Sequence, residues 1–328
     1  MTKNRFFNIV SILLPLVLAL TACASSPNNA ANGNQEEMSE PAEQEAESMP
    51  EPISLTDGLG REITLEGPAQ RVVSLAPSNI EILFAIGAGD QVVGRDDFAN
   101  WPEEVIDLPS TGGSFGELNT EIILDLEPDL VLAAELTTPE QVQSLEDLGL
   151  TVFFLTNPID LEGLYKNIMT VAQLTGHEGE AEQVVEGLKG RVAAIEDKIA
   201  TTDEKPLVFY ELDSTDPSAP WTAGGGTFID TLITLAGGEN IGAAFEGAWV
   251  QISAEEIISQ DPDIILLGDS IWGVTSEDVA ARPGWEALSA IQNGMVFPFN
   301  DDLASRPGPR LIDGLEELAK LIHPELFE

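Results

Sequence analysis

Two glutamates, Glu121 and Glu255, occupy matching positions in two similar segments of the chain. The first segment reads LNTEIILDLEPDLVLA (118–133) and the second ISAEEIISQDPDIILL (252–267). Each glutamate falls in the expected first turn of a helix, where the helix dipole favours a negative charge by about 0.3–1 kcal/mol. Taken singly, each is most simply a solvated carboxylate. As a matched pair on two lobes, they predict two charged projections on one face that dock into basic pockets of a partner.

The residues around the glutamates repeat as well. Asn119 and Ser253 are expected N-caps, because their side chains can accept a hydrogen bond from the first helical turn. Phe115 and Trp249 each stand six residues before the glutamate of their segment. Each repeat therefore offers an aromatic side chain in a loop that leads into a helix.

Aromatic side chains in loops are candidates for ligand contacts. Trp101, Phe115, Trp221 and Trp249 lie in segments rich in Gly, Pro or Asn, outside the expected strands. Loops at the carboxyl ends of strands face the ligand crevice in open α/β sheets. Any one of these rings could equally pack in a core. Several of them, from both halves of the chain, favour a large and partly flat ligand held between two lobes.

Basic residues are scarce, so Arg306 and Arg310 in the segment SRPGPR stand out, with Asp302 just before them. Two interpretations remain open for these arginines. They bind an anionic group of the ligand, or they neutralise a neighbouring carboxylate.

Other chemistries lack their residues. The chain has one Cys and two His, His177 and His323, each expected in an exposed turn or tail, so neither a Zn site nor a Ser-His-Asp triad is predicted. GGGTF (224–228) lacks the Lys-Ser/Thr ending of a phosphate-binding loop and is explained as a glycine-rich entry to a helix over 228–235. No cofactor is predicted. A hydrolase that uses only carboxylates remains an alternative.

Short apolar runs alternating with helical stretches predict an α/β fold with two Rossmann-like lobes. The predicted strands are near-continuous apolar runs, as expected where helices cover both faces of a sheet: 71–77, 130–135 and 151–156 in a lobe over 53–158, and 207–212, 264–269 and 295–300 in a lobe over 204–328. Residues 159–203 predict connecting helices, one of them long and amphipathic. Such a stiff bridge predicts lobes that rock by small angles.

The first 22 residues are predicted to be a lipoprotein signal peptide. Lys3 and Arg5 precede an apolar run, 6–20, and the segment ends in Leu-Thr-Ala before Cys23, the expected site of lipidation. Residues 23–52 are rich in Asn, Ala, Glu and Pro, which predicts a disordered acidic tether. The protein is therefore expected outside the cytoplasm, attached to the membrane through a lipid.

The charge limits the partners. The 328 residues include 57 acidic and 14 basic ones, a formal net charge of −43. A surface of this kind repels nucleic acid and predicts no basic footprint for it. It favours a partner that presents Arg or Lys, although most of the acidic residues are explained by solubility or salt tolerance.

Several of these segments together resemble a known family, the periplasmic binding proteins for vitamin B12 and iron complexes, which are receptors of ATP-binding cassette (ABC) importers. The similar segments are RVVSLAPSNIEILFAIGAGDQVVGRDDFANWPEEV, LNTEIILDLEPDLVLA, GGENI and PRLIDGLEELAKLIHP. The resemblance implies two Rossmann-like lobes joined by a long helix, with the ligand in the cleft between them. It also implies a monomer that delivers a small molecule to a permease dimer with separate ATPase subunits.

The resemblance also implies roles for individual residues. Glu121 and Glu255 match glutamates that dock on arginines of the two permease subunits. The positions that match loops lining the corrinoid site are Phe98, Trp101, Phe115, Trp221, Trp249, Asp302 and Arg306. Two departures are Ala134, where the B12 receptor has a tryptophan, and Phe98, where it has a tyrosine.

The ligand implied by the resemblance is a corrinoid, with a ferric siderophore or haem as alternatives. Haem requires a Tyr, His or Met ligand, and the chain has only Tyr165 and Tyr210 as tyrosines. An anionic siderophore calls for several arginines, which are few. Two rivals of other classes are the secreted hydrolase and a receptor that signals ligand occupancy to a membrane sensor.

Overall fold

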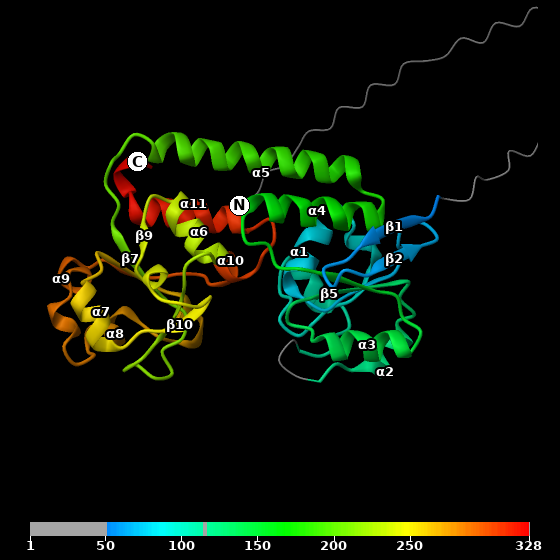
Figure 1. Ribbon diagram of the computed structural model, residues 1–328, viewed down its shortest axis with the longest axis horizontal. Helices are drawn as coiled ribbons and strands as arrows, with labels where there is room; N and C mark the ends of the chain where they lie inside the picture. The colour runs from blue at the N-terminus through cyan, green and yellow to red at the C-terminus, as the bar shows by residue number, and fades with distance from the viewer. Residues whose placement is uncertain (1–50, 114–116, 328) are drawn as a thin grey trace, which may run out of the picture. The chain divides into compact units, whose positions relative to one another are not determined.

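The computed structural model describes residues 51–113 and 117–327, which belong to one compact unit, 49–328. This unit holds two four-stranded sheets in which all neighbouring strands are parallel (Figure 1). We call the part around the sheet β4-β3-β5-β6 the N-lobe and the part around β12-β11-β7-β9 the C-lobe. Two parallel sheets with helices confirm the predicted α/β fold with two lobes.

The N-lobe sheet consists of β3 (Val72–Ser74), β4 (Val92–Gly94), β5 (Leu130–Ala134) and β6 (Val152–Leu155). An antiparallel hairpin, β1 (Ile53–Thr56) and β2 (Glu62–Leu65), precedes it. The helices of this lobe are α1 (Pro77–Ala85), α2 (Thr120–Asp125) and α3 (Pro139–Asp147), with the 3-10 turns η1 (Gly89–Gln91) and η2 (Glu103–Asp107).

The C-lobe sheet consists of β7 (Leu207–Glu211), β9 (Glu239–Asn240), β11 (Ile264–Leu267) and β12 (Val296–Pro298), and a separate antiparallel ribbon pairs β8 (Trp221–Ala223) with β10 (Trp249–Gln251). Its helices are α6 (Phe228–Leu235), α7 (Ala254–Gln260), α8 (Ser276–Ala280), α9 (Ser289–Asn293), α10 (Asp302–Ser305) and α11 (Leu311–Ile322). The 3-10 turns are η3 (Ile241–Ala244), η4 (Gly268–Trp272), η5 (Trp285–Ala287) and η6 (Pro324–Leu326).

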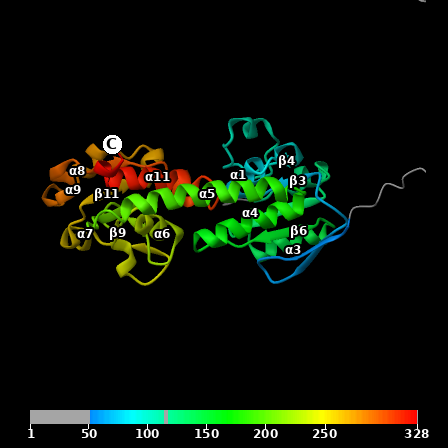
Figure 2. The same ribbon diagram turned by 90° about the horizontal axis from the view of Figure 1, so that it is seen from above.

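Two helices, α4 (Leu161–Thr175) and α5 (Glu178–Ile199), connect the lobes in sequence. Asp160 caps α4 by accepting a hydrogen bond from the Gly163 amide at 2.8 Å. The helix ends at Gly176, whose φ of 78° is the left-handed conformation that glycine adopts without strain. The long helix α5 packs on α4 and on α11 (Figures 1 and 2).

Both faces of each sheet are covered, as the continuous apolar strands predict. In β5, Leu130 and Leu132 join a large core shared with α4, α5 and α11, whereas Val131 and Ala133 face a separate core on the other side. In β11, Ile264 and Leu266 enter the same shared core, and the alternate residues face a third cluster. The shared core is therefore continuous from one lobe to the other.

The sequence repeat is also a structural repeat. The strands β4, β3, β5 and β6 have the same order and direction as β9, β7, β11 and β12. Asp129 accepts backbone hydrogen bonds just before β5, from the Gln70 amide at 2.8 Å and the Arg71 amide at 3.0 Å, and Asp263 accepts one from the Leu207 amide at 2.8 Å before β11.

The repeat extends to the backbone conformation. Glu127 and Asp261, which match in the two segments, are the two non-glycine residues with positive φ in the described part of the chain, at 46° and 48°. The same turn thus leads from helix to strand in each lobe.

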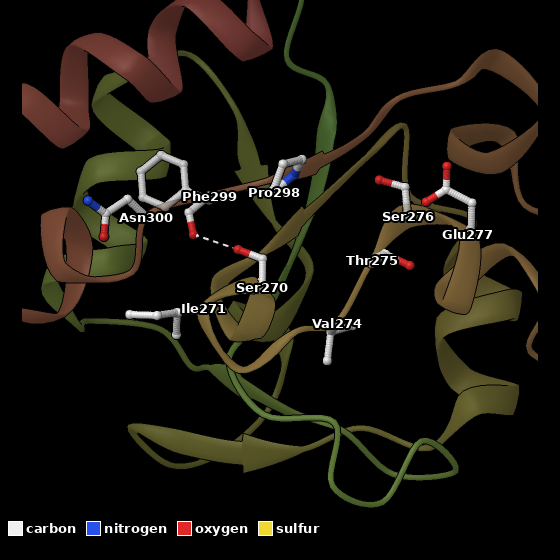
Figure 3. Close-up of a pocket in the computed structure, with 9 residues that line it drawn as sticks. All are labelled: Ser270, Ile271, Val274, Thr275, Ser276, Glu277, Pro298, Phe299 and Asn300. Atoms are coloured by element: carbon white, nitrogen blue, oxygen red, sulfur yellow. Dashed lines mark hydrogen bonds between the residues drawn. The ribbon is translucent and has the colours of Figure 1, made fainter.

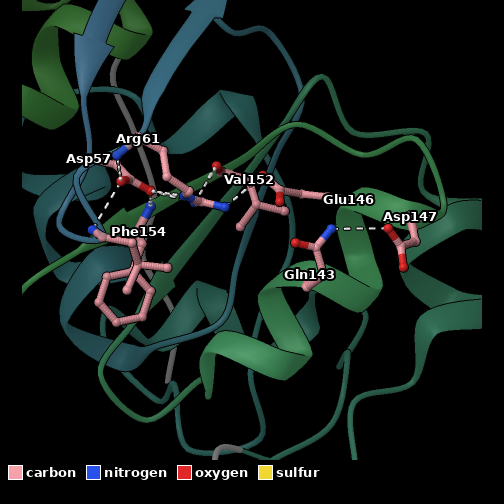
Figure 4. Close-up of polar contacts among 8 residues, drawn as sticks. Asp57, Arg61, Gln143, Glu146, Asp147, Val152 and Phe154 are labelled. Carbon is pink, nitrogen blue, oxygen red and sulfur yellow. Dashed lines mark hydrogen bonds and ion pairs between the residues drawn. The ribbon is translucent and has the colours of Figure 1, made fainter.

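A partly buried ion pair fixes the β1–β2 hairpin to the N-lobe (Figure 4). The Asp57 carboxylate accepts hydrogen bonds from the Arg61 guanidinium and from the Phe154 amide of β6. Arg61 Nη1 also donates to Glu146 Oε1 of α3 at 2.7 Å. Burial alone raises the pKa of Asp57, but the hydrogen bonds and charge of Arg61 outweigh it and lower that pKa below its usual value.

Two expectations from the sequence need correction. Trp221 and Trp249 were expected in loops but lie in the paired strands β8 and β10. The sequence did not indicate this ribbon because its short strands have no alternating apolar pattern. His323 is 1% exposed and not in an open tail, since η6 and the Gly237 carbonyl, 3.2 Å from Nε2, enclose its ring.

In the ranges 51–113 and 117–327, no helix has the length and apolarity needed to cross a membrane.

Candidate functional site

A cleft of about 580 Å³ lies between the two lobes, at the carboxyl ends of strands from both sheets. This is the position where open α/β sheets bind ligands. The lining residues are Ala76, Pro77, Ser78, Phe98, Ala134, Glu135, Leu136 and Asn157 of the N-lobe, and Leu212, Phe228, Trp249, Trp272, Asp301, Asp302, Ser305, Arg306 and Pro307 of the C-lobe.

Three exposed aromatic rings line this cleft. Phe98 is 41% exposed, Trp249 47% and Trp272 79%. Phe98 and Trp249 are among the predicted ligand residues, whereas Trp272 was missed. The one sign of it in the sequence is an apolar pair, Ile271 and Trp272, placed directly before Gly273 and after a predicted strand.

Trp221 and Trp101 are exposed but do not line the cleft. Trp221 pairs with Gln251 and Trp249 with Ala223, so the two tryptophans lie on one face of the β8–β10 ribbon. Trp101 instead stacks against a guanidinium, with its ring centre 4.7 Å from Cζ of Arg310. Only part of the predicted aromatic set therefore surrounds the hollow itself.

Arg306 bridges the two lobes. Its Nη1 donates to Asn100 Oδ1 at 2.7 Å and its Nη2 donates to the Phe98 carbonyl at 3.2 Å. Asp302, four residues earlier, pairs with Arg306 at 2.7 Å and accepts a hydrogen bond from Asn100 at 3.4 Å. The contacts with Glu81 and Asp302 are those expected of arginines that neutralise nearby carboxylates.

Glu81 of α1 is the N-lobe partner of both arginines. Its Oε1 lies 3.1 Å from Arg310 Nη1 and 3.5 Å from Arg306 Nη1, and the residue is 3% exposed. Burial raises the pKa of Glu81 to about 7, although the two arginines act in the opposite direction. We call Glu81, Asn100, Asp302, Arg306 and Arg310 the interlobe polar cluster.

Two further acids lie beside the cluster, Asp96 buried and Asp301 half-buried. Burial raises the pKa of Asp96 to about 6, although its Oδ1 accepts a hydrogen bond from the Phe98 amide at 2.8 Å. Asp301 accepts one from the Tyr210 hydroxyl at 2.6 Å, and burial raises the pKa of both groups. Of these acids with raised pKa values, only Asp301 is among the described residues that line the cleft.

The two predicted docking glutamates are exposed at equivalent positions. Glu121 lies in the first turn of α2, where Asn119 Oδ1 accepts from the Ile122 amide at 3.1 Å. Glu255 lies in the first turn of α7, where Ser253 Oγ accepts from the Glu256 amide at 3.2 Å. Each helix packs on the sheet face opposite to the shared core. The contacts are those expected of the two N-caps.

The remaining predictions concern lipidation, one further aromatic residue, metal binding and haem ligands. Cys23 and Phe115 lie outside the described residues. In the part of the chain that the structure covers, no group of three or more His, Cys, Asp or Glu side chains is arranged to hold a metal ion. Of the two tyrosines considered as haem ligands, Tyr165 in α4 is 5% exposed and Tyr210 in β7 is fully buried.

A family model described as periplasmic binding protein matches residues 72–303. The chain belongs to the periplasmic binding protein family. Its members bind and hand over a substrate, so the chain is a binding protein and not an enzyme, and the hydrolase alternative is set aside.

Two curated relatives and one solved structure place this periplasmic binding protein more closely. It is 34% identical, over 84% of the chain and 87% of the relative, to the uncharacterized ABC transporter substrate-binding lipoprotein YvrC of Bacillus subtilis. It is 30% identical, over 98% of the chain and 86% of the relative, to a cobalamin-binding protein of Halobacterium salinarum. The periplasmic heme-binding protein RhuT of Roseiflexus sp. RS-1 superposes with a TM-score of 0.70, at 28% identity, over 79% of this chain and 99% of that one.

Proposed function

We propose that this protein is the extracytoplasmic substrate-binding lipoprotein of an ABC importer, and that it binds a corrinoid in the interlobe cleft. The observation that carries the proposal is a cleft with exposed aromatic rings, in which the one basic side chain among the described lining residues, Arg306, already contacts carboxylates. Phe98, Trp249 and Trp272 offer broad apolar surface. Such surface suits a large ligand with flat faces.

The charges of the cleft favour a corrinoid over haem or an anionic siderophore. Arg306 is the only basic side chain among the described residues that line it, and it contacts Glu81 and Asp302. Glu135 and Asp302 add negative charge to the walls. Haem propionates or an anionic iron chelate would meet carboxylates without an available arginine, whereas a neutral corrinoid avoids that repulsion.

Axial coordination gives a second argument against haem. No Tyr, His or Met occurs among the described residues that line the cleft. Tyr210 donates its hydroxyl proton to Asp301, and burial raises its pKa well above the usual value, which opposes formation of a phenolate ligand. The relationship to the Halobacterium cobalamin-binding protein over nearly the whole chain supports the same choice.

The ligand is tested by titrating the purified protein with cyanocobalamin, haemin and a ferric hydroxamate, with heat and visible absorption as readouts. We expect saturable binding of cyanocobalamin in a one-to-one complex. Tighter binding of haemin or of the ferric hydroxamate would contradict the corrinoid assignment and leave the family assignment intact.

Delivery is proposed to use Glu121 and Glu255. Both are exposed, and each sits in the first turn of an equivalent helix on an equivalent face of its lobe. We expect the double variant Glu121→Ala, Glu255→Ala to lose uptake of labelled cyanocobalamin by cells while ligand affinity stays within about twofold, because neither residue lines the cleft.

A matched control removes two exposed glutamates from the first turns of other helices, Glu140→Ala with Glu178→Ala. This control loses the same charge and should transport normally. Normal uptake by the Glu121/Glu255 variant would rule out the docking assignment and would favour a receptor that signals without a permease.

A further inference from the structure

Trp272 is the most exposed large hydrophobic side chain in the described part of the chain, at 79%. An aromatic side chain that becomes buried removes about 150–250 Å² from water. An indole that faces solvent forgoes that stabilisation unless something covers it. Because Trp272 also lines the interlobe cleft, a bound ligand is the natural cover.

The segment that carries Trp272 is fixed at its base. The turn η4 follows β11 directly, and Gly268 at its start lies so close to Tyr210 that a Cβ there would approach the ring to 2.8 Å. Ser270 Oγ donates to the Phe299 carbonyl at 3.2 Å (Figure 3). The indole is therefore presented by a firmly seated turn, which lowers the entropy lost when a ligand binds.

The neighbouring residue Ile271 contacts a different space. It is 57% exposed and lines a separate hollow of about 510 Å³ with Val274 and Phe299 (Figure 3). Two adjacent apolar residues on one turn thus border two hollows, and only Trp272 borders the cleft. Ile271 is consequently a matched control for loss of exposed apolar surface at this turn.

The N-lobe supplies an apolar residue to the same cleft. Leu136 follows β5, the strand equivalent to β11, and is itself exposed. Trp272 and Leu136 therefore come from equivalent strand ends in the two lobes. A ligand with a broad apolar face can cover both, whereas a compact chelate offers no such face.

We propose that Trp272 is a ligand-stacking residue that fits this cleft to a ligand with a flat face. The choice of a corrinoid as the ligand rests on the function proposed above. The stacking role of the Trp272 indole does not depend on that choice and applies to any planar macrocycle. Stacking on the ring removes water from both surfaces and adds the attraction between the indole and the conjugated system.

The test compares Trp272→Ala, Trp272→Phe and Ile271→Ala with the unaltered protein, using cyanocobalamin as the probe. Loss of the indole contact should weaken binding by about tenfold or more. Phenylalanine should restore most of the affinity, and Ile271→Ala should stay within about twofold. The induced circular dichroism of the bound corrin should change in Trp272→Ala and persist in Ile271→Ala.

Ferric desferrioxamine B, which has no flat face, should bind Trp272→Ala no more weakly than the unaltered protein. Equal affinity of Trp272→Ala and the unaltered protein for cyanocobalamin would overturn the proposal. If the unaltered protein binds haemin and not cyanocobalamin, the corrinoid function fails, and the same comparison with haemin then decides the role of Trp272.

Discussion

The ends of β5 and β11 occupy equivalent places in two equivalent sheets, yet they present different side chains to the cleft. The chain after β5 offers Glu135 and Leu136 and then turns into α3. The chain after β11 forms η4 and offers Trp272. Before the same two strands, by contrast, Asp129 and Asp263 make similar backbone hydrogen bonds.

This comparison separates two classes of residue. Residues that support the sheets are alike in both lobes, because each sheet has the same strand order and needs the same turns. Residues at the cleft differ, as expected if the proposed ligand contacts both lobes and offers each a different surface. Changes to the first class should alter stability and spare affinity, and changes to the second should do the reverse.

The largest expected effect is the loss of stability on removing a buried ion pair of the C-lobe. Arg282 pairs with both carboxylate oxygens of the fully buried Glu211, Nη2 to Oε1 at 2.8 Å, and stacks on Trp285 at 4.6 Å. Arg282→Ala leaves a buried carboxylate without its partner, which costs about 3–5 kcal/mol. Urea unfolding measures this loss.

The control is Arg191→Ala. Arg191 pairs with Asp313 and Glu316 on partly exposed surface, so its removal should cost about 1 kcal/mol or less. Equal losses in the two variants would contradict the argument from burial.

The next effect is the pH dependence of the interlobe polar cluster. The pKa of Glu81 is raised from 4.5 to about 7, so the folded protein holds a proton there that the unfolded chain releases. The associated stability is fully present below about pH 4.5 and is lost as the pH rises through about 7, by about 3 kcal/mol. Glu81→Gln should reduce this slope when Tm is followed from pH 4 to 8, and the raised pKa of Asp96 should account for a remaining slope of the same sign.

Glu316 is a control whose contribution to stability should depend on pH in the opposite direction, and Glu316→Gln should remove that contribution. Its hydrogen bond to Arg191 lowers the pKa of Glu316, so the stability it contributes is lost as the pH falls. A Glu81→Gln variant with the same Tm profile as the unaltered protein would show that the raised pKa does not influence folding.

A third comparison separates the two tryptophans of the β8–β10 ribbon. Trp249 lines the cleft and Trp221 does not. Trp249→Ala should weaken cyanocobalamin binding by about tenfold, and Trp221→Ala by less than about threefold. Calorimetric titration of both variants distinguishes the cleft wall from the rest of the ribbon. A larger loss of affinity in Trp221→Ala than in Trp249→Ala would show that the ligand binds elsewhere on the ribbon.

The smallest effect tests the repeat itself. Asp129 accepts two backbone hydrogen bonds and Asp263 accepts one, all at 2.8–3.0 Å. Asp129→Ala should therefore destabilise by about 1–2 kcal/mol and Asp263→Ala by about 1 kcal/mol. Both should leave ligand affinity unchanged. Thermal unfolding that ranks them the other way would show that the two turns are not equivalent supports.

The sequence predicted three of the four strands of each sheet and missed the edge strands β4 and β9. The expected runs 130–135 and 264–269 contain β5 and β11, and the helix expected over 228–235 is α6. The β8–β10 ribbon was missed because its three-residue strands, WTA and WVQ, do not lie in longer apolar runs as β3 and β12 do. Short elements of this kind depend on tertiary contacts for their conformation.

The site was harder to predict for a different reason. Arg306 meets Asn100 and Phe98 from more than 200 residues away, and no local pattern encodes such a contact. The exposure of Trp272 likewise depends on where η4 sits against the rest of the C-lobe. The sequence could propose which residue types line a cleft, but not which of them are already engaged with each other.

The ion pair between Asp57 and Arg61 has a mechanical consequence. The chain enters the N-lobe through the β1–β2 hairpin, so tension applied on the N-terminal side of Ile53 passes through the hairpin pairing to this ion pair and from there to β6 and α3. None of these residues lines the cleft. A force applied through an N-terminal anchor would therefore act on the outer edge of the N-lobe and would not act directly on the residues that line the cleft.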